Sequence, residues 1–338
     1  MRCVPFTSDA VTLHGRIVPE NGGIWLGWTN TGFSFRFEGR HITFRFAPPA
    51  RGQVPYVGIL VDKEPRRMLP VDPEHPVLEI SLPTSGEHTV RLLKMTELLD
   101  DISLFVEGVY LEDGARLLPP PPLSSRRLEF IGDSITCGYG NLCAGPMEPF
   151  SPETEDSTQT YAALTARHFG ADARYLCRSG RGIVTDCDGC RAQPAARWFF
   201  ETSLTHPTPW DFTSWQPDVL VINMGTNDHN GGLSSEEFIP AAQNFLRRIR
   251  GVYPKARLLW MYGLMDDEYI PAIKEIVESI RAEDPLLDLL LVPSVNPYPE
   301  EHGSCYHPNL LGHARAARAL IPKIAEMTGW EACPSFWP

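Results

Sequence analysis

Four consecutive prolines, Pro119–Pro122, separate two stretches of the chain whose hydrophobic residues follow different patterns. A run of prolines is stiff and lacks backbone N–H donors, so it connects domains rather than joining a helix or a sheet. We therefore expect a first domain over residues 1–118, a proline-rich linker over 119–126 and a second domain over 127–338. A chain of 338 residues has room for two domains of ordinary size.

The first stretch consists of short runs in which apolar and polar residues alternate, as in 33–37 and 41–46. Alternation over five to eight residues, bounded by Gly, Pro or Asp, is typical of a strand with one buried face. Five further runs of this kind lie at 24–28, 57–61, 77–81, 88–93 and 103–111. A series of such strands without a helical pattern between them predicts an all-β sandwich of the jelly-roll type.

The second stretch alternates between short apolar runs and longer segments with helical periodicity. The strands are expected at 128–131, 174–177, 218–222, 256–262 and 286–292, and the helices at 160–169, 236–252, 267–282 and 308–328. Strands that alternate with helices of this length form a parallel sheet that is covered on both faces. The sequence therefore predicts a three-layer α/β domain.

The charge balance limits the partners of the protein. The chain has 30 Lys and Arg against 42 Asp and Glu, a formal net charge of −12, and a pI near 5.3. Nucleic-acid binding depends mainly on cationic contacts, so we expect no nucleic-acid partner. No apolar run is long enough to cross a membrane, and no export signal is visible, so we expect a cytoplasmic protein with eight reduced cysteines. Secretion stays possible if a leader has been removed.

Residues with complementary chemistry follow four of the predicted parallel strands. Ser134 follows the first strand, Gly180 and Gly182 the second, Asn227 the third, and His307 lies in the loop after the last. Ligands of open α/β sheets gather at the carboxyl ends of the strands, so these residues are expected at one edge. Together they supply a hydroxyl nucleophile, approachable backbone N–H groups, a carboxamide donor and a base, which is the set that acyl transfer requires.

Each of these residues taken alone has a structural explanation. A serine after a strand is often a helix N-cap, an isolated histidine is often a core residue, and glycine or asparagine often closes a turn. Four strand ends with complementary chemistry in one domain favour the catalytic interpretation.

The segments around these residues resemble the sequence blocks of the SGNH, or GDSL-type, hydrolases. Phe130–Asn141 resembles the first block, Met224–Asp228 the third and Tyr306–Asn309 the fifth, while Ser179–Gly182 is similar to the second. The extended first block and the predicted β-sandwich are most similar to carbohydrate esterase family 2, the two-domain acetyl-esterases of plant polysaccharides. The usual lipase elbow G-x-S-x-G is absent, because Thr136 stands at its second glycine.

The resemblance implies a role for each candidate residue. Ser134 would be the nucleophile and His307 the general base. The backbone N–H groups of Ser134 and Gly180, with the side-chain amide of Asn227, would form the oxyanion hole, and Gly182 is an alternative to Gly180.

The chain departs from the family pattern just before the histidine. Many SGNH enzymes have an Asp three residues before it and some have it two before, where this chain has Ser304 and Cys305. The nearest acids are Glu300 and Glu301. Family 2 includes members in which a main-chain carbonyl orients the base, so the resemblance implies a Ser-His dyad.

The expected function is that of a serine esterase that removes acetyl groups from O-acetylated carbohydrate, such as acetyl-xylan or glucomannan. One alternative keeps the site but changes the substrate to a lipid, aryl ester or thioester. Another is a carbohydrate-binding pseudo-hydrolase, which the missing Asp suggests. The sugar, its ester position, the acyl size limit and the oligomeric state are left open.

Two further features are weighed against simpler interpretations. The rings of Trp260 and Tyr262 are candidates for stacking on sugar, although Trp260 lies in a pattern typical of a buried strand. The segment Cys187–Cys190 has the spacing of metal ligands, but no second pair of zinc ligands is visible in the sequence. We therefore interpret it as a turn with two thiols, and expect no metal and no cofactor.

Overall fold

The chain forms two compact units. The computed structural model describes residues 1–333 apart from 51–53, 63 and 98–102. The first unit comprises Met1–Leu123 together with Ser203–His206, and the second comprises Ser124–Thr202 and the described residues from Pro207. Residues 203–206 lie within the predicted second domain but are assigned to the first unit, which no feature of the sequence predicts.

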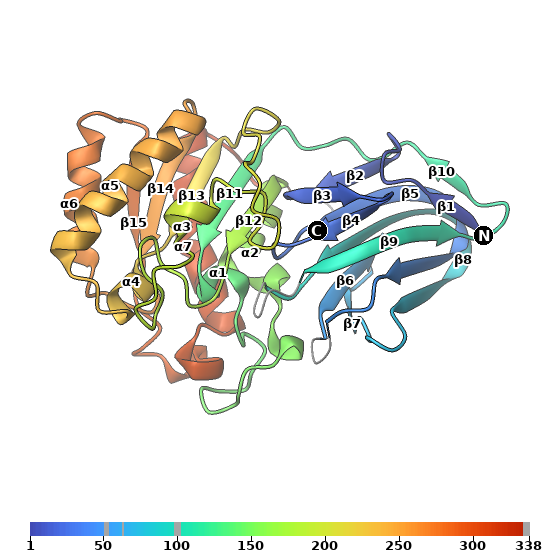
Figure 1. Ribbon diagram of the computed structural model, residues 1–338, viewed down its shortest axis with the longest axis horizontal. Coiled ribbons are helices and arrows are strands. Elements are labelled where there is room, and N and C mark those ends of the chain that lie inside the picture. Colours follow the sequence, from blue (N-terminus) through green and yellow to red (C-terminus); the bar gives the residue numbers. More distant parts are fainter. Residues whose placement is uncertain (51–53, 63, 98–102, 334–338) are drawn as a thin grey trace. The chain divides into compact units, whose positions relative to one another are not determined.

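The first unit is a curled antiparallel sheet (Figure 1). Its strands run in the order β3-β4-β9-β5-β8-β6-β7, with β1 paired to β9, and β2 and β10 paired to β5. The strands are β1 Arg2–Val4, β2 Val11–His14, β3 Ile17–Glu20, β4 Gly23–Leu26, β5 Gly32–Phe46, β6 Tyr56–Val61, β7 Arg67–Pro70, β8 Val77–Lys94, β9 Leu104–Leu111 and β10 Arg116–Leu118.

Two of these strands are longer than the sequence predicts. The predicted runs 33–37 and 41–46 are both part of β5, and 77–81 and 88–93 are both part of β8. Gly39 of β5 pairs with Gly86 of β8, and the register shifts directly after this pair. Such a bulge bends a strand without ending it. The described strands therefore form one curled sheet, and the jelly-roll sandwich stays a prediction.

The second unit confirms the predicted parallel-sheet α/β domain. Its five strands run in the order β12-β11-β13-β14-β15, and every neighbouring pair is parallel. The strands are β11 Arg127–Gly132, β12 Asp172–Cys177, β13 Val219–Asn223, β14 Arg257–Tyr262 and β15 Leu287–Leu291. The helices are α1 Ser134–Cys137, α2 Tyr161–Phe169, α3 Ala195–Trp198, α4 Thr226–Asn230, α5 Ser235–Val252, α6 Ile270–Arg281 and α7 Leu310–Thr328.

Alternate residues of the parallel strands pack into two different layers. Leu259 and Met261 of β14 belong to a core shared with α2 and α7, whereas Trp260 between them packs its ring against Phe238 of α5. Helix α6 lies beside α5, and Gln243 and Ser279 form a hydrogen bond between the two helices. All five residues of β13 are buried, as expected for a central strand covered on both faces.

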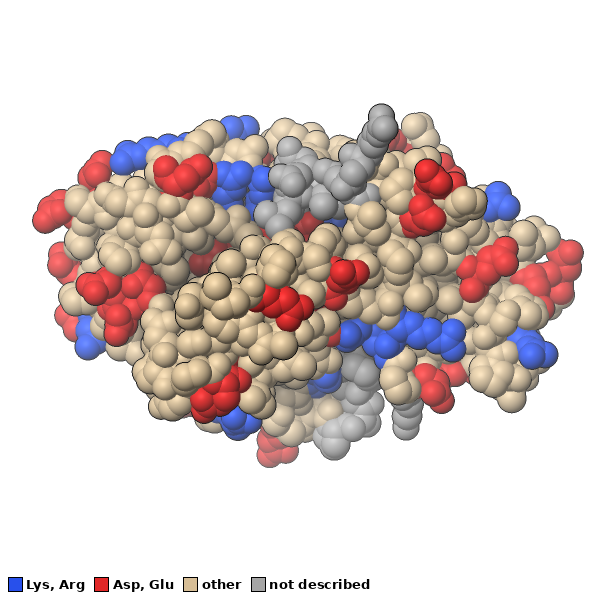
Figure 2. Space-filling model, turned by 90° about the horizontal axis from the view of Figure 1, so that it is seen from below, with Lys and Arg blue, Asp and Glu red and all other residues tan. Residues whose placement is uncertain are grey.

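Figure 2 shows charged side chains of both signs on the face that it draws. In the face shown in Figure 2, acidic side chains form separate groups with basic side chains among them. Within the residues that the structure describes, no helix has both the length and the apolar character of a membrane span.

Candidate active site

Ser134 lies where β11 turns into α1. Gly132 ends the strand, and the carboxylate of Asp133 caps the helix by accepting the N–H of Ile135 at 3.0 Å. Ser134 is the first residue of the helix and is 8% exposed. The N–H groups of the first helical turn have no partner within the helix, so the N–H of Ser134 is available to a ligand.

His307 lies between the last strand and α7 and contacts Ser134 directly. Its Nε2 is 2.8 Å from Ser134 Oγ, and its Nδ1 is 3.1 Å from the main-chain oxygen of Ser304. The carbonyl can only accept, so Nδ1 carries the proton and Nε2 accepts from the serine hydroxyl. Burial lowers the pKa of His307 to about 4, although the Ser304 carbonyl favours the protonated form. The imidazole is therefore neutral at pH 7.

An unusual backbone conformation precedes His307. Cys305 and Tyr306 have φ angles of 50° and 62°, in the left-handed region. Each such residue costs about 1–3 kcal/mol and requires support from its surroundings. Here the support comes from the loop after Ser134, because Pro146 accepts the N–H of Cys305 at 3.0 Å and Gly140 accepts that of Ser304 at 3.2 Å.

The side chain at position 304 has a different role from its carbonyl. The hydroxyl of Ser304 donates to the main-chain oxygen of Glu148 at 2.7 Å, so this side chain is not the partner of His307. Glu301 binds Arg315 through both of its carboxylate oxygens, each 2.8 Å from Nε. In the described part of the chain, no hydrogen bond or ion pair joins His307 to a carboxylate.

The two glycines of the loop after β12 differ in their surroundings. Gly180 has a φ of +75°, and its N–H has no hydrogen-bond partner among the described residues. A Cβ on Gly182 would lie 2.5 Å from Oδ2 of Asp228, so position 182 has no room for a side chain. Gly180 thus has a free donor, whereas Gly182 is required for packing.

Asp228 holds this loop in place, a role that the sequence analysis missed. Its carboxylate accepts the N–H groups of Ile183 and Val184 at 2.8 Å and of Thr185 at 3.1 Å. Burial raises the pKa of Asp228 to about 6, although these backbone donors oppose the shift. Its position directly after Asn227 was the only signal in the sequence.

Asn227 lies beside the residue that precedes the nucleophile. Its Nδ2 donates to Oδ2 of Asp133 at 3.2 Å and to the main-chain oxygen of Arg181 at 3.0 Å. The structure therefore brings Asn227 to the same edge of the sheet as Ser134, His307 and the Gly180 loop.

The two aromatic candidates for sugar stacking are buried. Trp260 is 0% exposed and its indole donates to the main-chain oxygen of Met224. Tyr262 is 1% exposed and its hydroxyl donates to Asp266 at 2.6 Å. Neither ring presents a face to a sugar, which agrees with the core interpretation of Trp260.

An aromatic pair that the sequence analysis did not single out lies at His307. The Tyr139 ring centre is 4.6 Å from the imidazole, and Phe150 stacks on Tyr139 at 4.1 Å. Tyr139 follows Ser134 by five residues in the first sequence block. The pair shields one side of the imidazole and contributes to its burial.

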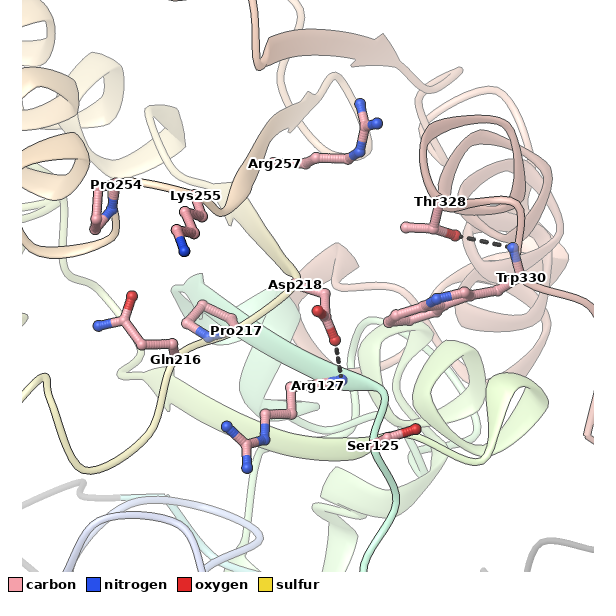
Figure 3. Close-up of a pocket in the computed structure, with 10 residues that line it drawn as sticks. All are labelled: Ser125, Arg127, Gln216, Pro217, Asp218, Pro254, Lys255, Arg257, Thr328 and Trp330. Atoms are coloured by element: carbon pink, nitrogen blue, oxygen red, sulfur yellow. Dashed lines mark hydrogen bonds between the residues drawn. The ribbon is translucent and has the colours of Figure 1, made fainter.

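A hollow of about 630 Å³ lies at the opposite edge of the parallel sheet (Figure 3). Arg127, Asp218 and Arg257, at the amino ends of β11, β13 and β14, line it together with Trp330. None of the residues predicted for the site lies in this hollow, because Ser134 follows the carboxyl end of β11.

Comparison with protein families gives two matches that together cover most of the chain. Residues 130–315 match the GDSL-like lipase/acylhydrolase family. Residues 13–121 match the carbohydrate esterase 2 N-terminal domain.

The chain is also similar to individual proteins that are named as esterases. The cellulase/esterase CelE of Acetivibrio thermocellus is 31% identical over 252 residues, which are 72% of this chain and 31% of CelE. An acetylxylan esterase/glucomannan deacetylase of Cellvibrio japonicus is 25% identical over 81% of this chain and 77% of its own length. This chain thus spans about a third of CelE and about three quarters of the Cellvibrio protein.

A solved structure matches almost the whole chain. The family two carbohydrate esterase from Clostridium thermocellum, in complex with cellohexaose, superimposes with a TM-score of 0.87 and 26% identity. The match covers 95% of this chain and 99% of that structure.

Proposed function

The chain belongs to the GDSL-like lipase/acylhydrolase family, and we propose that it is a serine esterase that removes acetyl groups from O-acetylated carbohydrate. The observation that carries the proposal is the 2.8 Å contact between Ser134 Oγ and a neutral His307. A neutral imidazole that accepts from a serine hydroxyl is the arrangement that activates a nucleophile.

The proposed reaction has two halves. His307 Nε2 takes the proton of Ser134 as Oγ attacks the acetyl carbonyl carbon, and the imidazolium then gives that proton to the departing sugar oxygen. In the second half His307 takes a proton from water, whose oxygen attacks the acyl-enzyme. The proton then returns to Ser134 as acetate leaves. In both halves the Ser304 carbonyl keeps the proton on Nδ1 and so keeps Nε2 directed at the reacting oxygen.

We propose that three donors stabilise the negative oxygen of each tetrahedral intermediate. The N–H groups of Ser134 and Gly180 have no partner in the described residues, so they can serve this oxygen without losing another bond. Asn227 is already engaged, and its amide would exchange the longer bond, to Asp133, for one to the oxyanion. Stabilisation by such preformed donors is usually the largest single contribution to the rate enhancement of acyl transfer.

The proposed substrate class rests on the relatives. Their names include acetylxylan esterase and glucomannan deacetylase, and the first unit matches an N-terminal domain of carbohydrate esterases. We therefore propose an acetylated polysaccharide or oligosaccharide of plant origin as the substrate. A complete set of nucleophile, base and free N–H donors favours an enzyme over a carbohydrate-binding pseudo-hydrolase.

The proposal is tested by comparing acyl groups and glycans. We expect hydrolysis of p-nitrophenyl acetate, much slower hydrolysis of p-nitrophenyl butyrate, and acetate release from acetylated xylan or glucomannan. Aryl-ester hydrolysis without acetate release from either glycan would favour the small-ester alternative. If the folded protein hydrolyses neither ester but binds glycan, the pseudo-hydrolase alternative is correct.

Replacing Asn227 tests the oxyanion hole. We expect Asn227→Ala to lower kcat by about 10²–10³-fold with little change in KM, because the lost bond strengthens in the transition state. The measurement is steady-state kinetics on p-nitrophenyl acetate, with Asn296→Ala as a surface control. A rise in KM at unchanged kcat would instead place Asn227 in ground-state binding.

The pH dependence should show two steps on the acid side. As pH falls through about 6, Asp228 becomes protonated and its bonds to residues 183–185 weaken, which loosens the loop that carries Gly180 (the oxyanion loop, residues 179–185) and lowers kcat/KM. As pH falls through about 4, His307 becomes protonated and can no longer act as base. We expect Asp228→Asn to be less active and to lack the upper step. Circular dichroism at each pH separates titration from acid unfolding, and an upper step that persists in folded Asp228→Asn would contradict the assignment.

A further inference from the structure

Beside the oxyanion loop lies a cluster of metal-ligating side chains that the proposed reaction does not use. One ligand atom each from Asp186, Asp188 and Cys190 lies within 4.8 Å of the other two. The two cysteines of this segment lack a second pair of zinc ligands in the sequence, but in the structure Asp186 and Asp188 lie beside one of them, Cys190.

Asp186 is the buried member of the cluster. It is 4% exposed, and its Oδ1 has no hydrogen-bond partner, while Oδ2 pairs with Arg181. A buried carboxylate oxygen without a donor, in a side chain that lies close to a second carboxylate and a thiol, is an environment that a cation would stabilise.

Asp188 and Cys190 close the cluster from the solvent side. Both residues are exposed, and the Asp188 carboxylate accepts the N–H of Cys190 at 3.0 Å. The main-chain N–H of Asp186 in turn donates to the oxygen of Cys190 at 2.7 Å. These bonds fold residues 186–190 into one turn, so the three side chains are already close together before a ligand binds.

We propose that Asp186, Asp188 and Cys190 bind a thiophilic divalent cation, with Zn²⁺ as the best-matched ion. One thiolate and two carboxylates are ligands of the kind that Zn²⁺ accepts, and three protein ligands leave the fourth tetrahedral position to water. Mg²⁺ and Ca²⁺ prefer sites built entirely from oxygen, so the thiol selects against them.

The position of the site connects it to the oxyanion loop. Cys187, inside the same turn, donates its N–H to the oxygen of Gly180 at 2.9 Å, and Arg181 pairs with Asp186. A cation at the cluster would therefore restrain the segment that carries the Gly180 N–H. The proposal concerns cation binding alone, so it does not depend on whether the protein is an esterase.

The test is direct binding of Zn²⁺ to the reduced, chelator-treated protein. We expect one equivalent to bind, as measured by isothermal titration, and Co²⁺ to give a sulfur-to-cobalt charge-transfer band. Cys190→Ser and Asp186→Asn should each lower the Zn²⁺ affinity by at least about tenfold. Even the loss of a residue that only hydrogen-bonds to a metal ligand lowers metal affinity by about 10–100-fold. Cys190→Ser should also abolish the cobalt band.

Cys3→Ser, which removes an exposed thiol of β1, is the matched control and should bind Zn²⁺ as the wild type does. Cys190 is exposed, so its replacement by serine should leave the fold intact, and circular dichroism checks this. Absence of saturable binding by the reduced wild type would overturn the proposal. Equal binding by the wild type, Cys190→Ser and Asp186→Asn would also overturn it, because the ion would then lie elsewhere.

Discussion

Ser134→Ala should lower kcat on p-nitrophenyl acetate by about 10⁴-fold or more and leave the fold unchanged. The substitution removes the only atom that the proposed mechanism makes covalent with the acyl group. Alanine is a good helix former at the first position of α1, and Asp133 continues to cap the helix. The thermal midpoint should therefore change little.

The control for this variant is a serine of the same unit that takes no part in the site. Ser279 is exposed on α6, where its hydroxyl donates to the oxygen of Ile276, and Ser279→Ala should retain full activity. Substantial turnover by folded Ser134→Ala would remove this residue from the nucleophile role. Loss of acetate release from glycan in parallel with loss of aryl-ester hydrolysis would assign both reactions to one site.

His307→Ala should lower kcat by about as much as Ser134→Ala does, and the double variant should have a kcat little lower than that of either single variant. The two residues act as a unit, so removing the second does not remove an independent contribution. Steady-state kinetics on all three variants measure this directly. Additive losses would mean that the serine and the histidine work in different steps.

The dyad is tested by replacing the acids that stand nearest to His307 in the sequence. If the Ser304 carbonyl alone orients the imidazole, Glu300→Gln and Glu301→Gln should keep kcat within about threefold of wild type. If one of them were the third member of a catalytic triad, its replacement by the amide would lower kcat about 10⁴-fold. Glu301→Gln weakens the ion pair with Arg315, so its thermal midpoint is measured alongside. A large loss in either folded variant would contradict the dyad.

The sequence predicts the second unit well, because parallel strands buried on both faces read as apolar runs between amphipathic helices. Helix α5, expected at 236–252, is found at Ser235–Val252. The first unit was harder to predict. The bends at Gly39 and Gly86 interrupt the alternation that identifies a strand, so β5 and β8 each appear as two strands.

The same distinction applies to the site. Ser134, Asn227 and His307 carry their chemistry in side chains, so the strand ends that hold them could be predicted to meet. The contribution of Ser304 comes from its main-chain oxygen, which every residue type has, and Asp228 acts on backbone N–H groups of a different loop. The family resemblance implies a main-chain carbonyl beside His307 without saying which residue provides it, and the contact of Asp228 follows no pattern that is visible in one sequence.

The carbonyl that faces His307 has a consequence for how such sites change over time. An orienting aspartate is lost by a single codon change, whereas the Ser304 oxygen survives any substitution that preserves the left-handed turn at Cys305 and Tyr306. The feature that must be kept is a backbone shape supported by the 140–148 loop, and the Ser304 hydroxyl takes part in that support through its bond to Glu148. A sequence search that requires an acid before the histidine would therefore miss proteins with a working Ser-His dyad. A substitution in the 140–148 loop could abolish activity although the motif around the histidine is unchanged.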